Sequence, residues 1–529
     1  MPPKRHHSGR VKSIKCRRWS GFMKIAICQI NTITADLEGN VQRCLDAVNQ
    51  TIRDKPDLIV LPEMAVCGPF AMDILLDSSF VSALQTANLD FAWLNRFNPP
   101  ILFGSLIASE KSISNHGNLL NSALLASNGT NEIVAQQKVL WDFDIHHDSR
   151  WFCSGEISKI IRINNTNIRP LIGKDVMNYS DLVFPENEKE PDLIIALHNA
   201  VFANQDIQEK IEHLMKIPYP SIVVNQVGGH DGLIFEGQSL FINPQKQKCS
   251  ALKKFQTDTN FLSFPNTDFL PIQKNTQEAD WLEAICLGIR DFVHKNNLKH
   301  VYLGLSGGID SAVTTVLACQ ALGPENMTVL SLPSRFNDPR STISSQELCN
   351  TLNINFLEIS IEPFFNLFEH ELNTLAKNEN VLENIQARLR AVILMAHVNF
   401  YGGLLLNTSN KTELSLGYGT LYGDMAGTLS PIGDLTKPEV YQLARWINRS
   451  QEIIPEFILN RKPSAELRLN QVDPFDYPII SPQIENYVQN NQSPPSMRAS
   501  EHKRHQFGTI LKLSQKTFGN GRFIPITRR

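Results

Sequence analysis

The sequence lacks several features that would assign it at once to a protein class. It contains no run of 18 apolar residues, so we expect no membrane-spanning helix. Its nine cysteines form no C-x-x-C pair and follow no regular spacing, which argues against a disulfide framework or a zinc site. The formal net charge is only −3, so nucleic acid is not expected as a bulk electrostatic partner. The sequence therefore predicts a cytoplasmic protein with reduced thiols.

Acidic residues are absent from residues 1–22, which contain seven Lys or Arg. This basic leader also lacks the apolar stretch of a secretory signal. An Arg-rich transit segment and a nucleic-acid patch are alternatives. We expect a disordered extension ahead of Met23.

The length of 529 residues exceeds what one hydrophobic core usually serves, so we expect at least two domains. Residues 23–262 alternate short apolar runs, such as KIAICQI and LIVLPEM, with helical patterns, which predicts a layered α/β domain. Residues 263–280 are polar and contain proline, as in a linker. In residues 281–529, strands separated by helices predict a doubly wound parallel sheet that binds ligand at the carboxyl ends of its strands.

The strongest local motif is SGGIDS, at residues 306–311, between the apolar run VYLGL and a helical pattern. Gly307 and Gly308 allow the backbone to approach a polyphosphate, and amides at a helix N-terminus attract anions. The hydroxyls of Ser306 and Ser311 add donors, and Asp310 can hold Mg²⁺. No lysine ends the motif, so it is not a G-x-x-x-x-G-K-[ST] loop.

SGGIDS resembles the phosphate loop of the PP-loop ATP pyrophosphatases. Five later blocks resemble, in order, those of the NAD synthetase family: ENIQARLR, NTSNKTELSLGYGTLYGDMAG, DLTKPEVYQLARW, KPSAELR and EHKRHQ. In that family ATP adenylates the carboxylate of nicotinate adenine dinucleotide, and ammonia then displaces AMP. The resemblance implies nicotinate adenine dinucleotide, ATP and ammonia as substrates, with Mg²⁺ as cofactor.

The resemblance also implies roles for single residues. The expected catalytic residues of this half are Asp310, Lys437 and Lys503, and the expected magnesium ligands are Asp310 and Glu413. ATP or substrate is expected to bind at Ser306, Gly307, Gly308, Ser311, Arg388, Thr408, Asp424 and Ser464.

Some positions depart from the family pattern. Phe336 replaces a tyrosine, and Asp338 is expected to place a carboxylate near the ATP phosphates. Ser409 and Ser481 replace a glycine and an aspartate, and the segment 494–501 is short. These departures bear on affinity and rate more than on the type of reaction.

Residues 23–262 resemble the nitrilase-type glutaminase domain of glutamine-dependent NAD synthetases, an α-β-β-α sandwich with a Glu–Lys–Cys triad. Glu63 in LPEMAV matches the general base, and Lys138 in QQKVLWDF matches the cation. Gly173 occupies the place of the nucleophilic cysteine, and Lys174 that of the glutamate after it. Neither Cys67 nor Cys153 lies on the strand-to-helix turn that aims the nucleophile. We therefore expect no glutamine hydrolysis.

The leading hypothesis is an ammonia-using NAD synthetase whose inactive glutaminase domain serves as a scaffold in a homo-oligomer. One alternative is an intact glutamine-dependent enzyme with a relocated nucleophile. Another is a non-catalytic paralogue that acts as a structural or regulatory partner of an active synthetase.

Overall fold

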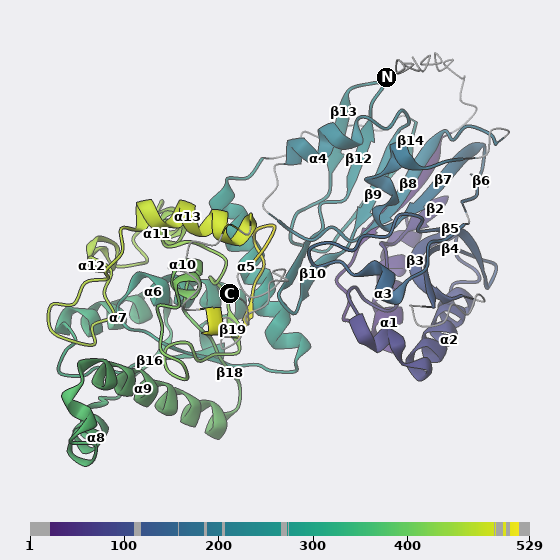
Figure 1. The fold of residues 1–529 in the computed structure, drawn as a ribbon. Helices are drawn as coiled ribbons and strands as arrows, with labels where there is room; N and C mark the ends of the chain where they lie inside the picture. Colours follow the sequence, from purple (N-terminus) through teal and green to yellow (C-terminus); the bar gives the residue numbers. More distant parts are fainter. Residues whose placement is uncertain are drawn as a thin grey trace, which may run out of the picture.

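A computed structural model describes residues 22–109, 118–156, 158–184, 188–203, 207–265, 272, 274–490, 492, 501–503 and 508–517. Figure 1 shows two lobes, an N-terminal one in purple to teal and a C-terminal one in teal, green and yellow. The basic leader lies outside the described residues, apart from Phe22. No helix of the described chain is long and apolar enough to cross a membrane.

The N-terminal lobe contains two six-stranded sheets. The first has the order β14 (Asp258–Phe264), β1 (Met23–Gln29), β2 (Leu58–Val60), β3 (Ile101–Ala108), β4 (Leu119–Ser127) and β5 (Thr130–Gln136). The second has the order β13 (Lys248–Ala251), β12 (Leu240–Asn243), β9 (Ser221–Asn225), β8 (Leu193–His198), β7 (Thr166–Ile172) and β6 (Ile161–Ile163).

Strand β1 shows why this lobe forms layers. Its side chains alternate between two buried faces, because successive residues of a strand point in opposite directions. Ile25 and Ile27 pack between the two sheets, while Ala26 and Cys28 face helices α1 (Leu37–Ile52) and α2 (Ser78–Leu94). Helix α4 (Ile207–Leu214) covers the outer face of the second sheet. This arrangement confirms the expected α-β-β-α sandwich.

The C-terminal lobe is built on a four-stranded parallel sheet of order β17 (Asn355–Glu358), β16 (Met327–Ser331), β15 (Val301–Gly304) and β18 (Leu404–Leu405). Helix α6 (Ile309–Leu322) packs against one face, and α9 (Glu379–Tyr401) against the other. The remaining helices are α5 (Gln277–Lys295), α7 (Pro339–Leu352), α8 (Glu362–Glu371), α10 (Lys411–Leu416), α11 (Lys437–Ile447), α12 (Glu456–Asn460) and α13 (Tyr477–Gln489). The expected doubly wound parallel sheet is confirmed.

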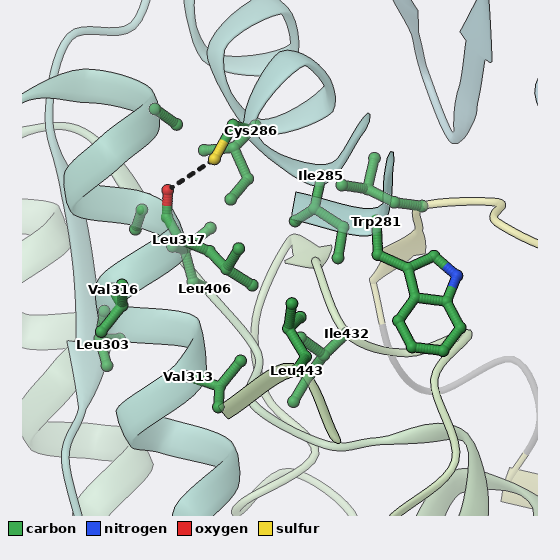
Figure 2. Close-up of a cluster of buried hydrophobic side chains, with 14 of the residues drawn as sticks. Trp281, Ile285, Cys286, Leu303, Val313, Val316, Leu317, Leu406, Ile432 and Leu443 are labelled. Carbon is green, nitrogen blue, oxygen red and sulfur yellow. Dashed lines mark hydrogen bonds between the residues drawn. The ribbon is translucent and has the colours of Figure 1, made fainter. Parts of the chain in front are cut away.

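The core of the C-terminal lobe joins α5 to α6 (Figure 2). Ile285 and Cys286 of α5 lie in the same cluster as Val313 and Leu317 of α6. The Cys286 thiol donates to the backbone oxygen of Leu317 at 3.5 Å. All eight cysteines of the described residues are free. A buried thiol of this kind behaves as a small apolar side chain with a weak donor.

Helix α5 also fixes the two lobes to each other. Asp291 of α5 accepts hydrogen bonds from Asn31 Nδ2 at 2.8 Å and from the backbone N–H of Gly229 at 2.7 Å. Lys295, one turn further, donates to Asn31 Oδ1 at 2.8 Å. Because Asn31 and Gly229 belong to the N-terminal lobe, this polar network sets the relative position of the lobes.

Candidate active site

The phosphate loop lies at the carboxyl end of β15, where the parallel strand gives way to α6. Gly307 has a φ of +77°, and a β-carbon there would lie 2.7 Å from both the side chain and the backbone oxygen of Ser341. Only glycine suits this position. Gly308 precedes the first turn of α6, so the N-terminal amides of that helix point at the loop.

Lys437 lies between two carboxylates at the strand ends. Its Nζ donates to Asp310 Oδ2 at 2.5 Å and to Glu413 Oε1 at 3.1 Å. Asn410 Nδ2 donates to the other oxygen of Asp310 at 2.8 Å. Burial raises the pKa of Glu413 to about 7, although the Lys437 ammonium opposes that rise. Burial lowers the pKa of Lys437, but Asp310 and Glu413 outweigh it and hold that pKa well above its ordinary value.

Two capping boxes place these side chains. Asn410 caps α10, with its side chain accepting from the Glu413 N–H while Glu413 reaches back to the Asn410 backbone. Thr436 and Glu439 form the same reciprocal arrangement at the start of α11. Capping boxes satisfy the free amides of a helix N-terminus and so fix where the helix begins. Glu413 and Lys437 are thereby held in the first turns of two adjoining helices.

A cavity of about 260 Å³ opens at these strand ends. Most of the expected site residues line it: Ser306, Gly308, Asp310, Ser311, Thr408, Glu413, Asp424, Lys437 and Ser464. Burial raises the pKa of Asp424, whose Oδ1 accepts from the backbone of Thr420 at 2.6 Å. Gly307 contributes its conformation to the loop and does not itself line the cavity.

Arg388 and Lys503 do not line this cavity. Arg388 is exposed and donates to the backbone oxygen of Leu421 at 3.1 Å. Lys503 donates to the backbone oxygens of Gly417 and Gly419 at 2.8 and 2.7 Å. The structure therefore does not bring these two cations to the phosphate loop.

The cavity has three further basic residues that the sequence analysis did not single out: Arg390, Arg461 and Lys462. Arg461 donates to Ser341 Oγ at 2.7 Å and to Gly307 O at 3.3 Å, and pairs with Glu466 at 2.7 Å. Burial lowers the pKa of Arg390 to about 10. Arg461 directly precedes the KPSAELR block, Lys462 begins that block, and Arg390 ends the ENIQARLR block. The sequence signal for these residues was therefore their position in or next to the matched blocks.

The Asp338 carboxylate does not line the nucleotide cavity, contrary to the expectation that it lies near the ATP phosphates. Its side chain caps α7 and pairs with Arg340 at 2.7 Å, outside the cavity lining. Phe336 packs against Phe365, with ring centroids 6.2 Å apart. Ser409 lines the cavity and Ser481 is buried, while residues 494–500 lie outside the described residues.

A second, smaller cavity of about 50 Å³ lies in the N-terminal lobe around Glu63. Asn121 Nδ2 donates to Glu63 Oε1 at 2.6 Å and to Gln137 Oε1 at 2.7 Å. Gln137 in turn donates to Asp148 Oδ2 at 3.0 Å. Burial raises the pKa of Glu63 to about 7. Lys174 also lines this cavity, and burial lowers its pKa.

Lys138 is not in this cavity, contrary to the expectation that it provides the cation beside Glu63. Its Nζ donates to the backbone oxygen of Val183 at 3.4 Å on the outside of the lobe. Its neighbour Gln137 is buried and points inward. Adjacent side chains of an extended segment point in opposite directions, so only one of the two can face Glu63.

Gly173 begins the 3₁₀ helix η2 (Gly173–Val176) directly after β7, with a φ of +61°. A β-carbon at this position would lie 2.7 Å from Gln137 Cδ and 3.1 Å from Asn121 Nδ2. Neither Cys67 nor Cys153 lines the cavity. Cys67 is buried with its thiol 3.2 Å from the backbone oxygen of Gly68, and burial raises its pKa to about 12.

The fold and the two cavities define a two-domain protein, in which a nitrilase-like sandwich precedes a PP-loop nucleotide-binding domain. Residues 281–518 match the NAD synthase family, and residues 24–175 match the carbon-nitrogen hydrolase family. The chain is 32% identical to the glutamine-dependent NAD(+) synthetase of Synechocystis sp., across 95% of this chain and 98% of that protein.

A second relative is the glutamine-dependent NAD(+) synthetase of Thermotoga maritima, 28% identical across 96% of this chain and 99% of that protein. The chain is also similar to the solved structure of the glutamine-dependent NAD+ synthetase of Acinetobacter baumannii in complex with ADP. That similarity has a TM-score of 0.77 at 26% identity, over 96% of this chain and 98% of that one. The chain belongs to the glutamine-dependent NAD(+) synthetase family.

Proposed function

We propose that this chain converts nicotinate adenine dinucleotide to NAD at the expense of ATP, with ammonia rather than glutamine as the nitrogen source. The observation that carries the synthetase half is the Asp310–Lys437–Glu413 cluster beside the phosphate loop. In the proposed reaction a nicotinate carboxylate oxygen attacks the α-phosphorus of ATP and pyrophosphate leaves. Ammonia then attacks the activated carbonyl carbon, AMP leaves, and a proton is lost to solvent.

The side chains around the cavity suit these two steps. The amides that begin α6 and the hydroxyls of Ser306 and Ser311 are donors for phosphate oxygens. Lys437 and Arg461 supply positive charge for the departing pyrophosphate. Asp424, Thr408 and Ser464 line the same cavity and are proposed to contact the nucleotides. For Arg388 and Lys503 we propose only an indirect role through the backbone oxygens they hold.

The residues present also fit Mg²⁺. Asp310 and Glu413 offer carboxylate oxygens on one side of the cavity, and Lys437 pairs with both. No group of three or more His, Cys, Asp or Glu suited to a metal occurs among the described residues, so phosphate and water oxygens would complete the shell. Mg²⁺ favours such partial protein coordination. When bound, it would neutralise the charge of the polyphosphate.

The proposal that the N-terminal domain does not hydrolyse glutamine rests on two positions. Gly173 has no side chain to serve as a nucleophile, and the side chain beside it is the neutral Gln137 instead of an ammonium. A thiolate and a cation for the oxyanion are what this chemistry needs. The thiolate is missing, and the lysine that lines this cavity is Lys174 rather than Lys138.

For the retained domain we propose a scaffold role within a homo-oligomer. Hydrogen bonds still order the cavity walls around Glu63 and Gln137, and the sheets of the domain are intact. In the synthetase domain, α9 leaves Val392, Phe400 and Tyr401 exposed at 65%, 81% and 69%. Exposed apolar side chains of this kind are suited to contact a second copy.

The test is NAD formation from nicotinate adenine dinucleotide, ATP and Mg²⁺, with ammonium or glutamine supplied separately. The proposal expects turnover with ammonium and none above background with ammonia-free glutamine. Comparable turnover with glutamine would refute the loss of glutaminase activity. No product from either source would favour a non-catalytic partner of an active synthetase.

A relocated nucleophile would be revealed by a glutamine-analogue electrophile. We expect this electrophile to label the cysteines of the folded protein no faster than iodoacetamide labels them. Cys67 is buried, and burial raises the pKa of its thiol to about 12, so the thiol stays un-ionised. Selective labelling of one cysteine, prevented by glutamine, would support the intact enzyme instead.

A further inference from the structure

A buried ion pair lies directly behind the Asp310–Lys437–Glu413 cluster. Lys411 Nζ pairs with Asp434 Oδ1 at 2.9 Å, and the two side chains are only 1% and 0% exposed. Neither residue lines the nucleotide cavity. Lys411 is the first residue of α10, which carries Glu413, and Asp434 lies three residues before Lys437 on the way into α11. The pair therefore joins the two segments that supply the expected magnesium ligand and the catalytic cation.

Backbone contacts confirm that these segments are held as one unit. The Lys411 N–H donates to the backbone oxygen of Leu435 at 2.8 Å. The Lys437 N–H donates to Thr412 Oγ1 at 3.0 Å. Loss of the Asp434 carboxylate would therefore remove one of the contacts that hold the segments of Glu413 and Lys437 together.

Asp434 is also the anchor of a C-terminal strap, which we define as residues 509–517. Its Oδ2 accepts from the backbone N–H groups of Leu513 and Ser514 at 2.7 and 2.6 Å, and its Oδ1 accepts from Ser514 Oγ at 3.0 Å. Strand β20 (Thr509–Ile510), at the start of the strap, pairs in parallel with β19 (Leu429–Ser430). One carboxylate therefore joins three segments of the chain.

The strap reaches the N-terminal lobe through Lys512. Its backbone N–H donates to Gly232 O at 2.7 Å, in the turn between β10 (Val227–His230) and β11 (Leu233–Glu236). Its ammonium, whose pKa burial lowers, donates to the backbone oxygen of Ser514 at 2.6 Å. Asp144 of the N-terminal lobe and Asp434 of the synthetase attract this ammonium electrostatically, at a longer distance than an ion pair. Asp144 lies in the loop that also carries His146, which lines the N-terminal cavity.

From these contacts we infer that Asp434 is a positioning residue for Glu413 and Lys437, and that the strap makes their placement depend on the N-terminal lobe. The N-terminal lobe would then support the synthetase without hydrolysing glutamine, because its contact with Lys512 stabilises the Asp310–Lys437–Glu413 cluster beside the phosphate loop. The inference rests on the proposed function, because it takes the cluster around Lys437 to bind Mg²⁺ and ATP.

The first experiment compares Asp434→Asn with Glu485→Gln in the full-length protein. The amide that the first substitution introduces cannot accept from two N–H groups and pair with Lys411 as a carboxylate does. We expect Asp434→Asn to raise the Mg²⁺ concentration for half-maximal activity at least fivefold and to lower kcat at least tenfold. Both values are measured well below the melting temperature of the variant. Glu485 is the other carboxylate on Lys411, at 2.8 Å, but does not touch residues 434–437, so Glu485→Gln should change both values less than twofold.

Two results would overturn the positioning role: a folded Asp434→Asn protein with unchanged Mg²⁺ dependence, or an equal effect of Glu485→Gln. Ser514→Ala, which removes one hydroxyl from Asp434, provides a milder variant should Asp434→Asn not fold, with an expected twofold to threefold shift of the same parameter. Equilibrium binding of Mg·ATP by each variant supplies a readout without turnover. A wild-type protein that binds Mg·ATP but forms no NAD would contradict the proposed reaction. The change in Mg·ATP affinity between the wild type and the Asp434 variant would still test the positioning role of Asp434.

The second experiment tests the dependence on the N-terminal lobe. Asp144→Asn removes the charge that faces Lys512, and Asp142→Asn is the matched control, since Asp142 bonds to the Ser149 N–H within its own loop. We expect Asp144→Asn to raise the half-maximal Mg²⁺ concentration twofold to fivefold and Asp142→Asn to leave it unchanged. The Asp144→Asn and Asp434→Asn effects should be non-additive in a double-mutant cycle. Additive effects, or an inert Asp144→Asn, would contradict the coupling between the lobes.

Discussion

A β-carbon on Gly173 would lie 2.7 Å from the side-chain carbon Cδ of Gln137. The amide of Gln137 thus fills the space beside Gly173, the position at which we propose that the glutaminase nucleophile is replaced. It is fixed there by hydrogen bonds to Asn121 and Asp148. A side chain introduced at Gly173 would therefore require Gln137 to move, so one substitution should not create a glutaminase.

Replacing Gly173 by cysteine alone is expected to give no glutaminase activity. The new side chain would collide with Gln137, and its left-handed backbone would add roughly 1–2 kcal/mol of strain. The double variant Gly173→Cys/Gln137→Lys provides both a thiol and a cation, and we expect it to release glutamate from glutamine measurably. Glutamate release and the melting temperature of each variant check this. Equal activity in the single and double variants would show that Gln137 is not the obstacle.

Lys437→Met is expected to lower kcat for NAD formation about 10²- to 10³-fold, because a buried cation beside the developing charge is lost and two carboxylates remain unneutralised. Lys503→Met should lower kcat less than tenfold, since among the described residues the hydrogen bonds of Lys503 go to backbone oxygens and its interaction with Asp424 is only electrostatic. Steady-state kinetics with ammonium measures both. A larger effect at Lys503 would mean that it reaches the reacting groups after all.

Arg461→Lys is expected to raise the KM for ATP about tenfold, a loss of about 1.4 kcal/mol. A lysine cannot contact Gly307, Ser341 and Glu466 together as the guanidinium does. Arg468→Lys is the matched control, because Arg468 is exposed and pairs with Glu379 on the surface. If both variants keep the wild-type KM, Arg461 has no part in shaping the phosphate loop.

Glu63→Gln is expected to stabilise the protein at alkaline pH. Burial raises the pKa of Glu63 from an ordinary 4.5 to about 7, so the folded state holds a proton that the unfolded state releases between these values. The contribution of Glu63 to stability is therefore full below about pH 4.5 and falls as the pH rises towards 7. At pH 8 the free energy of unfolding of the variant should exceed that of the wild type by roughly 1–3 kcal/mol, and the two should converge near pH 5. Thermal unfolding across this range measures the difference; a constant offset would exclude titration of Glu63 as its cause.

The sequence predicted best where a local motif carries its own geometry. SGGIDS needs a strand before it and a helix after it, and the structure has both, with Gly307 in a conformation that excludes other residues. Glu413 and Lys437 were identified from blocks that resemble the NAD synthetase family, and the structure shows that capping boxes at Asn410 and Thr436 begin their helices. The short apolar run KIAICQI likewise predicted the buried strand β1.

Predictions were less reliable where the direction of a side chain decides its role. Lys138 and Gln137 are neighbours in sequence, but only Gln137 points towards Glu63. Arg388 and Arg390 lie two residues apart on α9, roughly 200° around the helix axis, and only Arg390 lines the cavity. A sequence block that resembles a family does not show which of two similar residues faces the cavity.

The sequence by itself determined the α/β fold of both halves and the phosphate loop, because both depend on local patterns of a few residues. Only the tertiary structure decided that Gln137 occupies the space beside Gly173, that Arg461 supports the phosphate loop, and that Asp434 joins the synthetase to a strap touching the other lobe. These contacts join residues far apart along the chain. The packing of the whole fold decides which of these residues meet, so no local sequence pattern predicts the contacts.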